Sequence, residues 1–379
     1  MLEKNKKVLI CAHISQHLRY FHIPYLRWFK EQGYEVHVVT GDAHDVECCD
    51  VRHTVAITRK PWSLRNFAGY HQLRGIIDRE NFSLVECHTP MGGFMARLAA
   101  RAARRRGTKV IYMAHGFHFW TGAPWFNWLF YYPVEKWLSR YADCLITICE
   151  EDRARAVRNH FRAAEILKID GIGVELERFK RIGDKERKEL RKRFGFNEND
   201  FILIYVAEIS HRKNQEFLLQ VARSLKGKMA DLKVLLVGRD SLHGKCQALA
   251  ARLGLGDSVT FLGWRADVNQ LLGLGDVYVS TSRQEGQGIN LIEAMAVGLP
   301  VCATRIRGHC DVITDGENGC LVTLGNMREF AKSISTLRTD SVFREKIVQG
   351  AFKQLGRFEK KNILEALKPL YRKYLSRDD

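Results

Sequence analysis

Short apolar runs alternate with amphipathic segments along the first half of the chain. The apolar runs predict strands at residues 7–12, 35–40, 84–87, 109–113 and 144–148. Helical periodicity predicts helices between them, at residues 24–32, 65–79, 92–106 and 127–141. Strands that alternate with helices in this way predict a parallel sheet with helices on both faces.

The same alternation restarts after a charged, glycine-containing stretch between about residues 171 and 200. Strands are expected at residues 201–206, 234–237, 259–261, 277–280, 300–303 and 320–322. A chain of 379 residues is too long for one ordinary core, so we expect two domains. The pattern therefore predicts an α/β protein made of two facing Rossmann-like domains, residues 1–172 and 173–359. Ligands bind at the carboxyl ends of strands in such sheets, which predicts an active site in the cleft between the domains.

Composition narrows the class of protein. A hydrophobic content of 46% with only 7 prolines favours a globular chain over a disordered one. The sequence has no run of 18 uncharged apolar residues and no signal-peptide-like start, so we expect neither a membrane span nor a leader. The 10 cysteines lie mostly in apolar runs without metal-ligand spacing, which indicates buried, reduced thiols in a cytosolic protein.

The formal charge of +17 leaves three partners open: nucleic acid, an anionic membrane face and phosphorylated substrates. The densest basic runs are residues 101–109 and 185–193, and interleaved glutamates in the second are typical of a solvated helix face. No zinc-finger, RNP-type or basic-zipper pattern accompanies them. We therefore expect no nucleic-acid partner.

The most informative segment is residues 282–300, where Glu285 and Glu293 flank a Gly-x-Gly turn. Residues 291–295 predict the first turns of a helix, which Gly298 and Pro300 end. Backbone N–H groups at such a helix start favour an anion. These groups belong to Gly286, Gln287, Gly288, Ile289 and Asn290. With a carboxylate on each side to accept hydrogen bonds from hydroxyls, the segment fits a nucleotide sugar; an ordinary loop and helix with exposed glutamates is the alternative.

Residues 280–322 as a whole resemble the donor-binding core of the family 4 glycosyltransferases. The shared signature is Glu-(seven residues)-Glu followed by Ala-Met-Ala-x-Gly-x-Pro-Val, and matching residues continue across most of the chain. The resemblance implies the GT-B architecture, with a final helix in residues 360–379 packed on the first domain. It also implies a retaining sugar transfer that needs no cofactor. Glu285 matches the residue that meets hydroxyls of the donor sugar, and Glu293 matches the acceptor for the ribose hydroxyls.

A cation is needed where negative charge builds on the departing diphosphate. Lys213 follows the strand at 201–206 and matches the family pattern Gly-Arg-(four residues)-Lys-Gly by spacing. Glu208 stands where the family usually has the arginine, so Arg212 or Arg239 would have to supply a second charge. A solvated lysine at a helix start is the alternative for Lys213.

Further matches are weaker. Residues 261–265 resemble the loop beside the nucleobase, which places Leu262 near uracil. His115, after the strand at 109–113, matches the family histidine that faces the donor sugar across the cleft. In the first loop, His17 and Arg19 are expected on the acceptor side, although this loop lacks the paired glycines of many family members. No Asp-x-Asp lies between the donor motifs, so we expect no metal site.

Residues 117–137 are dense in aromatic side chains close to His115. They fit either a domain core or a membrane interface. The resemblance is strongest to members that assemble capsular or exopolysaccharide. It implies transfer of a sugar, expected to be an N-acetylhexosamine, from a UDP-sugar to a polyprenyl-diphosphate-linked glycan at the inner, anionic face of the cell membrane. Two alternatives stay open: a UDP-sugar 2-epimerase of the same fold, and a non-catalytic basic protein that binds membrane or nucleic acid.

Overall fold

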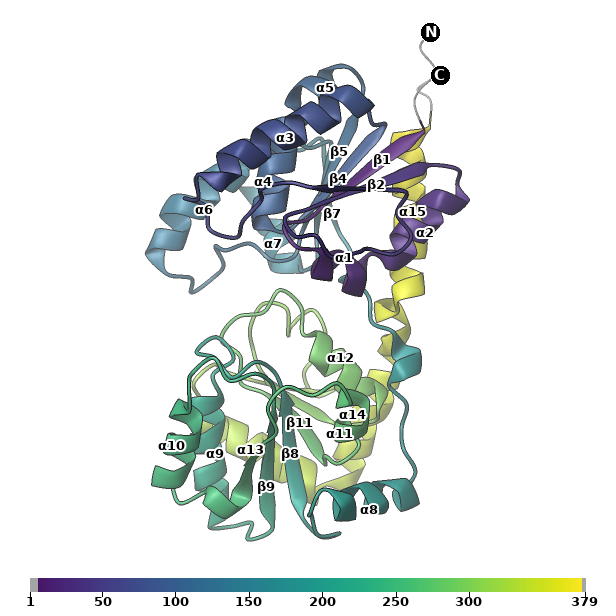
Figure 1. The fold of residues 1–379 in the computed structure, drawn as a ribbon. Helices are drawn as coiled ribbons and strands as arrows, with labels where there is room; N and C mark the ends of the chain where they lie inside the picture. Colours follow the sequence, from purple (N-terminus) through teal and green to yellow (C-terminus); the bar gives the residue numbers. More distant parts are fainter. Residues whose placement is uncertain (1–5, 377–379) are drawn as a thin grey trace. The chain divides into compact units, whose positions relative to one another are not determined.

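A computed structural model describes residues 6–376 of the chain. The chain divides into two compact units (Figure 1). Unit 1 comprises Met1–Gly173 together with Lys360–Asp379, and unit 2 comprises Val174–Glu359. Each unit is built around its own parallel sheet.

The sheet of unit 1 has seven strands within the described residues, in the order β3-β2-β1-β4-β5-β6-β7. Their bounds, in that order, are Val51–Thr54, Glu35–Thr40, Lys7–Cys11, Leu84–His88, Lys109–Ala114, Cys144–Thr147 and Glu165–Lys168. All neighbouring strands are parallel. The central strand β4 is buried along its whole length, as expected for a strand with helices on both faces.

Helices cover both faces of this sheet, and Figure 1 shows α3 and α5 on one face and α2 and α15 on the other. The helices of unit 1 are α1 (Ser15–Phe21), α2 (Ile23–Glu31), α3 (Arg65–Glu80), α4 (Pro90–Ala99), α5 (Arg101–Arg105), α6 (Trp125–Leu138), α7 (Glu150–Arg158), α15 (Lys360–Leu375) and the 3₁₀ turn η1 (Ser139–Tyr141). The C-terminal helix α15 packs on unit 1 through Tyr371, whose ring lies 5.5 Å from the ring of Trp28 and whose hydroxyl donates to Glu86 Oε1 at 3.0 Å.

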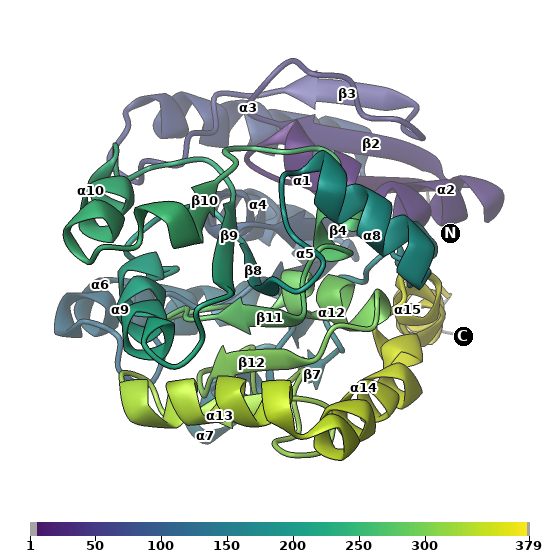
Figure 2. The ribbon, with the colours of Figure 1, turned by 90° about the horizontal axis from the view of Figure 1, so that it is seen from below.

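Unit 2 repeats the design with six strands within the described residues, in the order β10-β9-β8-β11-β12-β13. Their bounds, in that order, are Val259–Phe261, Leu232–Val237, Phe201–Val206, Val277–Ser280, Val301–Thr304 and Cys320–Val322. The helices are α8 (Asp184–Arg193), α9 (Gln215–Lys226), α10 (Lys245–Arg252), α11 (Val268–Leu272), α12 (Ile289–Ala296), α13 (Met327–Thr339), α14 (Ser341–Leu355) and the 3₁₀ turns η2 (Leu176–Arg178), η3 (Gly256–Ser258) and η4 (Gly356–Phe358). Figure 2 shows α13 beside β12.

The strand order of both sheets reverses next to the first strand, between β1 and β4 in unit 1 and between β8 and β11 in unit 2. Ligands of open parallel sheets bind at such a switch point, outside the carboxyl ends of the strands. The topology therefore marks one location in each unit before any side chain is considered.

The predicted fold class is confirmed, and several elements differ from the prediction in detail. The strands β3 and β7 were not predicted, because both are short sheet-edge strands with partly exposed side chains and lack the continuous apolar run of a central strand. The predicted helix at 92–106 is two helices, α4 and α5, with Ala100 between them. The 10 cysteines are free thiols, most of them buried. Among the described residues, no helix is both long and apolar enough to cross a membrane.

Candidate functional site

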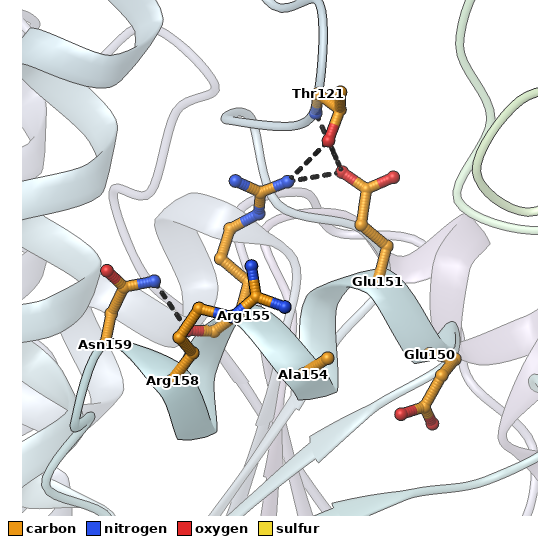
Figure 3. A pocket seen from close by; sticks show the side chains of 7 residues that line it. All are labelled: Thr121, Glu150, Glu151, Ala154, Arg155, Arg158 and Asn159. Atoms are coloured by element: carbon orange, nitrogen blue, oxygen red, sulfur yellow. Dashed lines mark hydrogen bonds and ion pairs between the residues drawn. The ribbon is translucent and has the colours of Figure 1, made fainter.

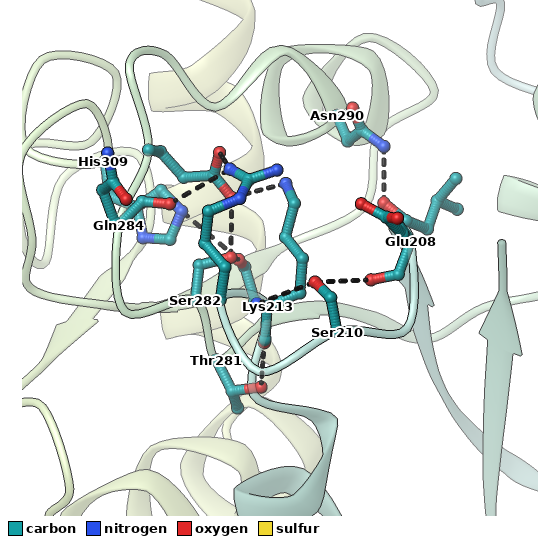
Figure 4. Close-up of polar contacts among 12 residues, drawn as sticks. Glu208, Ser210, Lys213, Thr281, Ser282, Gln284, Asn290 and His309 are labelled. Atoms are coloured by element: carbon teal, nitrogen blue, oxygen red, sulfur yellow. Dashed lines mark hydrogen bonds and ion pairs between the residues drawn. The ribbon is translucent and has the colours of Figure 1, made fainter. Parts of the chain in front are cut away.

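A charged cluster lies at the switch point of unit 2. Lys213, which follows β8, places its Nζ 2.5 Å from Glu285 Oε1, and Arg212 Nη1 lies 3.1 Å from Glu285 Oε2. Ser282 Oγ donates to Oε1 at 2.6 Å. Figure 4 shows Lys213 and Ser282 meeting in this cluster. The structure thus brings together three predicted site residues, Arg212, Lys213 and Glu285, from separate parts of the sequence.

The two cations keep the buried Glu285 carboxylate charged. Only 6% of the residue is exposed, and burial by itself raises the pKa of a carboxyl group. Attraction to Lys213 and Arg212 outweighs that effect and leaves the pKa of Glu285 below its ordinary value. Both of its oxygens are engaged by the cations and Ser282, so Glu285 holds the two cations in position.

Polar side chains of β8 and of the residues that follow β11 hold the turn that carries Lys213 in place. Tyr205 Oη donates to the carbonyl oxygen of Lys213 at 3.0 Å and lies 2.8 Å from Ser282 Oγ. Thr281 Oγ1 donates to the carbonyl oxygen of Asn214 at 2.9 Å. Asn214 itself has a left-handed backbone (φ 58°) and directly precedes the first residue of helix α9, Gln215. The cation is therefore held on a rigid turn.

The start of helix α12 lies next to this cluster in sequence and space. Gly288 precedes the first helical residue, Ile289, which packs at the edge of the unit 2 core. Asn290 Nδ2 donates to the carbonyl oxygen of Val206 at 2.5 Å, so this predicted donor-binding side chain ties α12 to the end of β8. Gly308 (φ 83°) packs against the loop before the helix, and a Cβ there would lie 2.9 Å from the carbonyl oxygen of Gly286.

Glu293 lies on α12 and stands apart from the charged cluster. It is partly buried, and among the described residues its carboxylate makes no hydrogen bond or ion pair. Burial raises the pKa of Glu293 to about 7, and this effect exceeds the opposing charge of Arg178. Since no protein group among the described residues occupies its oxygens, they remain available to accept hydrogen bonds from a ligand.

The remaining predicted donor residues lie around these groups without joining the cluster. The Glu208 side chain is exposed and accepts a hydrogen bond from Ser241 Oγ, away from the two cations. Arg239 is exposed after β9, and its carbonyl oxygen accepts from Ile209 N–H at 2.8 Å. Leu262 is partly buried against the core of unit 2, while Gln287 is partly exposed before α12. Of the two candidates for the second cation, the structure places Arg212 beside Lys213.

A different cluster lies at the switch point of unit 1. His17 Nε2 lies 3.2 Å from His115 Nε2 and 3.3 Å from His22 Nε2. His115 Nε2 in turn lies 3.3 Å from Nδ1 of His88, the last residue of β4. Burial lowers the pKa of each of the four imidazoles, that of His115 to about 4, so the rings are neutral at pH 7. Arg19, predicted with His17 on the acceptor side, is exposed on α1 and outside this cluster.

Comparisons with known proteins agree with this architecture. Residues 25–169 match the family "Glycosyl transferase 4-like domain", and residues 186–354 match "Glycosyl transferases group 1". EpsD of Bacillus subtilis (strain 168), which carries the name of a glycosyltransferase, is 44% identical over 373 residues, or 98% of either chain. The chain belongs to the family 4 glycosyltransferases.

Two further comparisons, one with a relative and one with a solved structure, agree with this family assignment. The capsular polysaccharide biosynthesis glycosyltransferase CapM of Staphylococcus aureus is 23% identical over 388 residues, or 99% of either chain. The crystal structure of Anabaena HepE in complex with UDP superimposes with a TM-score of 0.78 at 21% identity, covering 97% of this chain and 99% of HepE. The glycosyltransferase therefore has the GT-B fold.

Sequence reasoning missed several polar residues of the glycosyltransferase that support the charged cluster. His309 is buried, its Nδ1 lies 2.8 Å from the carbonyl oxygen of Thr304, and its Nε2 lies 3.2 Å from Ser280 Oγ. Arg307 Nε donates to the carbonyl oxygen of Glu285 at 3.2 Å. Their one sequence signal is position, because Arg307 and His309 follow β12 at the carboxyl edge of the sheet.

A surface pocket on α7 of the glycosyltransferase includes none of the predicted site residues (Figure 3). Three of its polar residues already pair with one another, because Glu151 Oε1 lies 2.5 Å from Arg155 Nη2 and accepts from the backbone N–H of Thr121 at 2.7 Å. We assign it no role in catalysis.

The aromatic segment of the glycosyltransferase divides between core and surface. Phe117 and Phe119 are buried, and Trp128 packs against the same core from α6. Trp125 is 75% exposed, and Phe130 is also exposed on α6. Trp125 and Trp128, three positions apart in this segment, therefore have different environments.

Proposed function

We propose that this glycosyltransferase moves a sugar from a UDP-sugar to a polyprenyl-diphosphate-linked glycan during polysaccharide synthesis, with retention at the anomeric carbon. The observation that carries the proposal is the cluster of Arg212, Lys213 and Glu285 beside the start of α12. It offers two fixed cations and a helix N-terminus at the switch point of a parallel sheet, which is a suitable environment for a diphosphate.

The two cations would act on the leaving group. Breaking the anomeric C–O bond transfers negative charge to the diphosphate, and groups already aimed at that charge lower the barrier. Lys213 and Arg212 are held by Glu285 before any substrate arrives, so little reorganisation is required. No divalent cation is needed at this location, and the departing phosphate oxygen accepts the proton of the attacking hydroxyl.

Other predicted residues would orient the donor. Glu293, whose carboxylate is unpaired within the described residues, would accept hydrogen bonds from the ribose hydroxyls. The backbone N–H groups around Gly286 and Gly288 would meet the phosphates at the helix start. Leu262 would lie near uracil, and His115 of unit 1 would face the donor sugar.

Names of relatives support the substrate class. One relative, 26% identical over 287 residues, is the Escherichia coli UDP-Gal:alpha-D-GlcNAc-diphosphoundecaprenol alpha-1,3-galactosyltransferase. CapM is named for capsular polysaccharide biosynthesis, and HepE has been crystallised with UDP-glucose. We therefore infer a UDP-sugar donor and a lipid-linked acceptor, with N-acetylhexosamines as the first sugars to test.

An acceptor with a polyprenyl tail requires the enzyme to reach a bilayer surface, and unit 1 presents a suitable face. Trp62 is 82% exposed, and its ring lies 6.5 Å from the ring of the exposed Phe130 on α6. The aromatic–basic patch comprises the exposed residues Arg59, Lys60, Trp62, Leu64, Arg65 and Phe67 together with Trp125 and Phe130 of α6. Apolar rings with flanking cations bind the interface of anionic bilayers.

The test is incubation of the purified protein with radiolabelled UDP-sugars and a membrane lipid extract. Label transferred to the lipid fraction supports the proposal, and the anomeric configuration of the product tests retention. Release of a free epimer would instead identify an epimerase of the same fold. No turnover with any UDP-sugar, by protein that still binds vesicles, would leave a non-catalytic basic protein and overturn the proposal.

A further inference from the structure

Four histidines of unit 1 converge at the carboxyl edge of its sheet. His17 lies on α1, His22 joins α1 to α2, His88 ends β4, and His115 directly follows β5. One ring nitrogen of each lies within 4.8 Å of the corresponding nitrogens of the other three. His22 and His88 are buried, and His17 and His115 are partly buried. Of these four residues, the proposed function uses His115 alone, as the residue that would face the donor sugar.

Hydrogen bonding alone cannot account for all the close contacts among these nitrogens. Each nitrogen of a neutral imidazole carries either one proton or one lone pair. The four nitrogens form a chain of three contacts, from His22 to His17, His115 and His88, at 3.3, 3.2 and 3.3 Å. Since each nitrogen can take part in only one full hydrogen bond, at most two of the three contacts can be ordinary hydrogen bonds. The neutral cluster is therefore left with at least one poor contact.

The spacing matches the coordination shell of a metal ion. Imidazole nitrogens bind Zn²⁺ at about 2.0–2.1 Å in tetrahedral geometry, which places neighbouring nitrogens about 3.3–3.4 Å apart. The three contacts above have nearly that length. The other pairs are separated by no more than 4.8 Å, so small side-chain rotations would complete the shell. A cation would accept all four lone pairs and remove the poor contact.

The surroundings of His88 supply the outer shell that such a site needs. Its second nitrogen, Nε2, is buried without a hydrogen-bond partner in the described part of the chain and lies 3.6 Å from Glu86 Oε1. The same Glu86 oxygen accepts a hydrogen bond from Tyr371 Oη at 3.0 Å. Histidines that bind a metal usually donate their other N–H to a carboxylate, and a small shift of the His88 ring would bring Nε2 within hydrogen-bond distance of Glu86 Oε1.

We propose that His17, His22, His88 and His115 bind one divalent transition-metal ion, with Zn²⁺ as the best match. An all-imidazole shell suits Zn²⁺, Cu²⁺ or Ni²⁺, whereas Mg²⁺ and Ca²⁺ prefer oxygen ligands. The ion would join the ends of β4 and β5 to the α1–α2 segment. Coordination through Nε2 would also fix the proton of His115 on Nδ1, and so set the hydrogen-bonding character of a predicted site residue.

The test uses the full chain with any affinity tag removed, stripped of metal and titrated with Co²⁺. Tetrahedral Co²⁺ absorbs visible light strongly and octahedral Co²⁺ absorbs weakly, so the spectrum reports the geometry. We expect one Co²⁺ per chain, the intense spectrum, and displacement by one equivalent of Zn²⁺. The variant His88→Gln should lose more affinity than the roughly 10–100-fold that loss of an outer-shell partner costs.

A matched control is His53→Gln. His53 belongs to a second histidine pair of unit 1, with its Nε2 3.0 Å from His37 Nδ1, but lies outside the cluster. This variant should bind Co²⁺ as the unmodified protein does. Equal loss in both variants, a weak octahedral spectrum, or no binding by the unmodified protein would overturn the proposal. If His88→Gln does not fold, X-ray absorption of the zinc-loaded protein decides: four imidazole nitrogens support the site, and a mainly oxygen shell contradicts it.

Discussion

The switch points of the two sheets occupy the same place in the fold and carry opposite chemistry. In unit 2, the loops after β8 and β11 bring two cations to one ionised carboxylate, Glu285. In unit 1, the corresponding edge, at β1 and β4, carries four neutral imidazoles. Topology thus fixes where a ligand can bind, and the side chains at that location decide which ligand it is.

The difference also shows how burial controls charge. Glu285 stays ionised because opposite charges lie beside it. His22 and His88 are equally buried, and because their close neighbours are mainly other imidazoles of the cluster, which do not stabilise a positive charge, burial lowers their pKa values. Burial alone drives a group to its neutral form, whereas burial with a partner preserves the charge.

The largest expected effect is that of Lys213→Ala. Removing one preorganised donor at a developing charge typically lowers turnover by about 100–1000-fold. We expect a loss of that size in kcat with a smaller change in donor affinity, because the charge matters most as the diphosphate departs. Steady-state kinetics on Lys213→Ala and on the exposed control Lys228→Ala would measure it. A loss confined to KM would assign Lys213 to ground-state binding instead.

The aromatic segment offers the next largest effect and tests whether membrane binding belongs to unit 1. Trp128→Ser should lower the free energy of unfolding by about 2–4 kcal/mol, because the ring packs against Phe119 and lies under Arg155. Trp125→Ser combined with Phe130→Ser should change it by no more than about 0.5 kcal/mol. The double variant should nevertheless release the protein from anionic vesicles.

Vesicle sedimentation and melting curves would measure both effects. Trp264→Ser in unit 2 removes an equally exposed ring, at 63% exposure, and should leave sedimentation unchanged. A folded Trp125→Ser/Phe130→Ser protein that still sediments with vesicles would end the membrane proposal for this face.

Glu293→Ala should weaken UDP binding by about 1–3 kcal/mol, because it removes the acceptor proposed for the ribose hydroxyls. The fold should be unaffected, since the Glu293 carboxylate makes no hydrogen bond or ion pair among the described residues. Calorimetric titration with UDP measures the change. Unchanged affinity would remove Glu293 from the donor site.

The smallest effect is a pH dependence of the free energy of unfolding that arises from Glu293, whose pKa is raised, whereas the cations beside Glu285 keep its pKa low. Burial raises the pKa of Glu293 to about 7 from an ordinary value of 4.5, so the folded protein binds more protons than the unfolded chain between those values. The contribution of Glu293 to stability is therefore lost as pH rises from about 4.5 to above 7. Glu293→Gln removes this cost and should stabilise the protein by about 1–2 kcal/mol at pH 8, with little effect near pH 4. Denaturant unfolding at both pH values would show it, and an equal effect at both would contradict the assignment.

The sequence was sufficient for the fold because periodicity is local. The buried strand β8 was predicted at its observed bounds, since six consecutive apolar residues leave few alternatives. The edge strands β3 and β7 were not predicted, because a strand at the exposed edge of a sheet does not need an apolar run. The helix after Glu285 was likewise readable from Gly298 and Pro300, which end it.

The contacts within each site could not be predicted from the sequence, because they depend on tertiary structure. Lys213 and Glu285 are 72 positions apart, and only the pairing of β8 with β11 brings them together. The expectation of no metal site considered only an Asp-x-Asp between the donor motifs, and the four histidines of unit 1, spread over 98 positions without ligand spacing, gave no signal. Asn290 was expected to offer its backbone N–H to the donor, and nothing in the sequence indicated that its side-chain amide donates to the carbonyl oxygen of Val206.

The central claim is that the cations of unit 2, and not the histidines of unit 1, bind the donor diphosphate. Calorimetric titration with UDP and with uridine tests it, because the difference in affinity between them isolates the diphosphate. In the double variant Arg212→Gln/Lys213→Gln, which keeps hydrogen-bond donors for the buried Glu285, we predict that this difference largely disappears. In a folded His17→Gln/His115→Gln variant it should persist. A difference that survives loss of both cations, or that collapses with the histidines, would contradict the account.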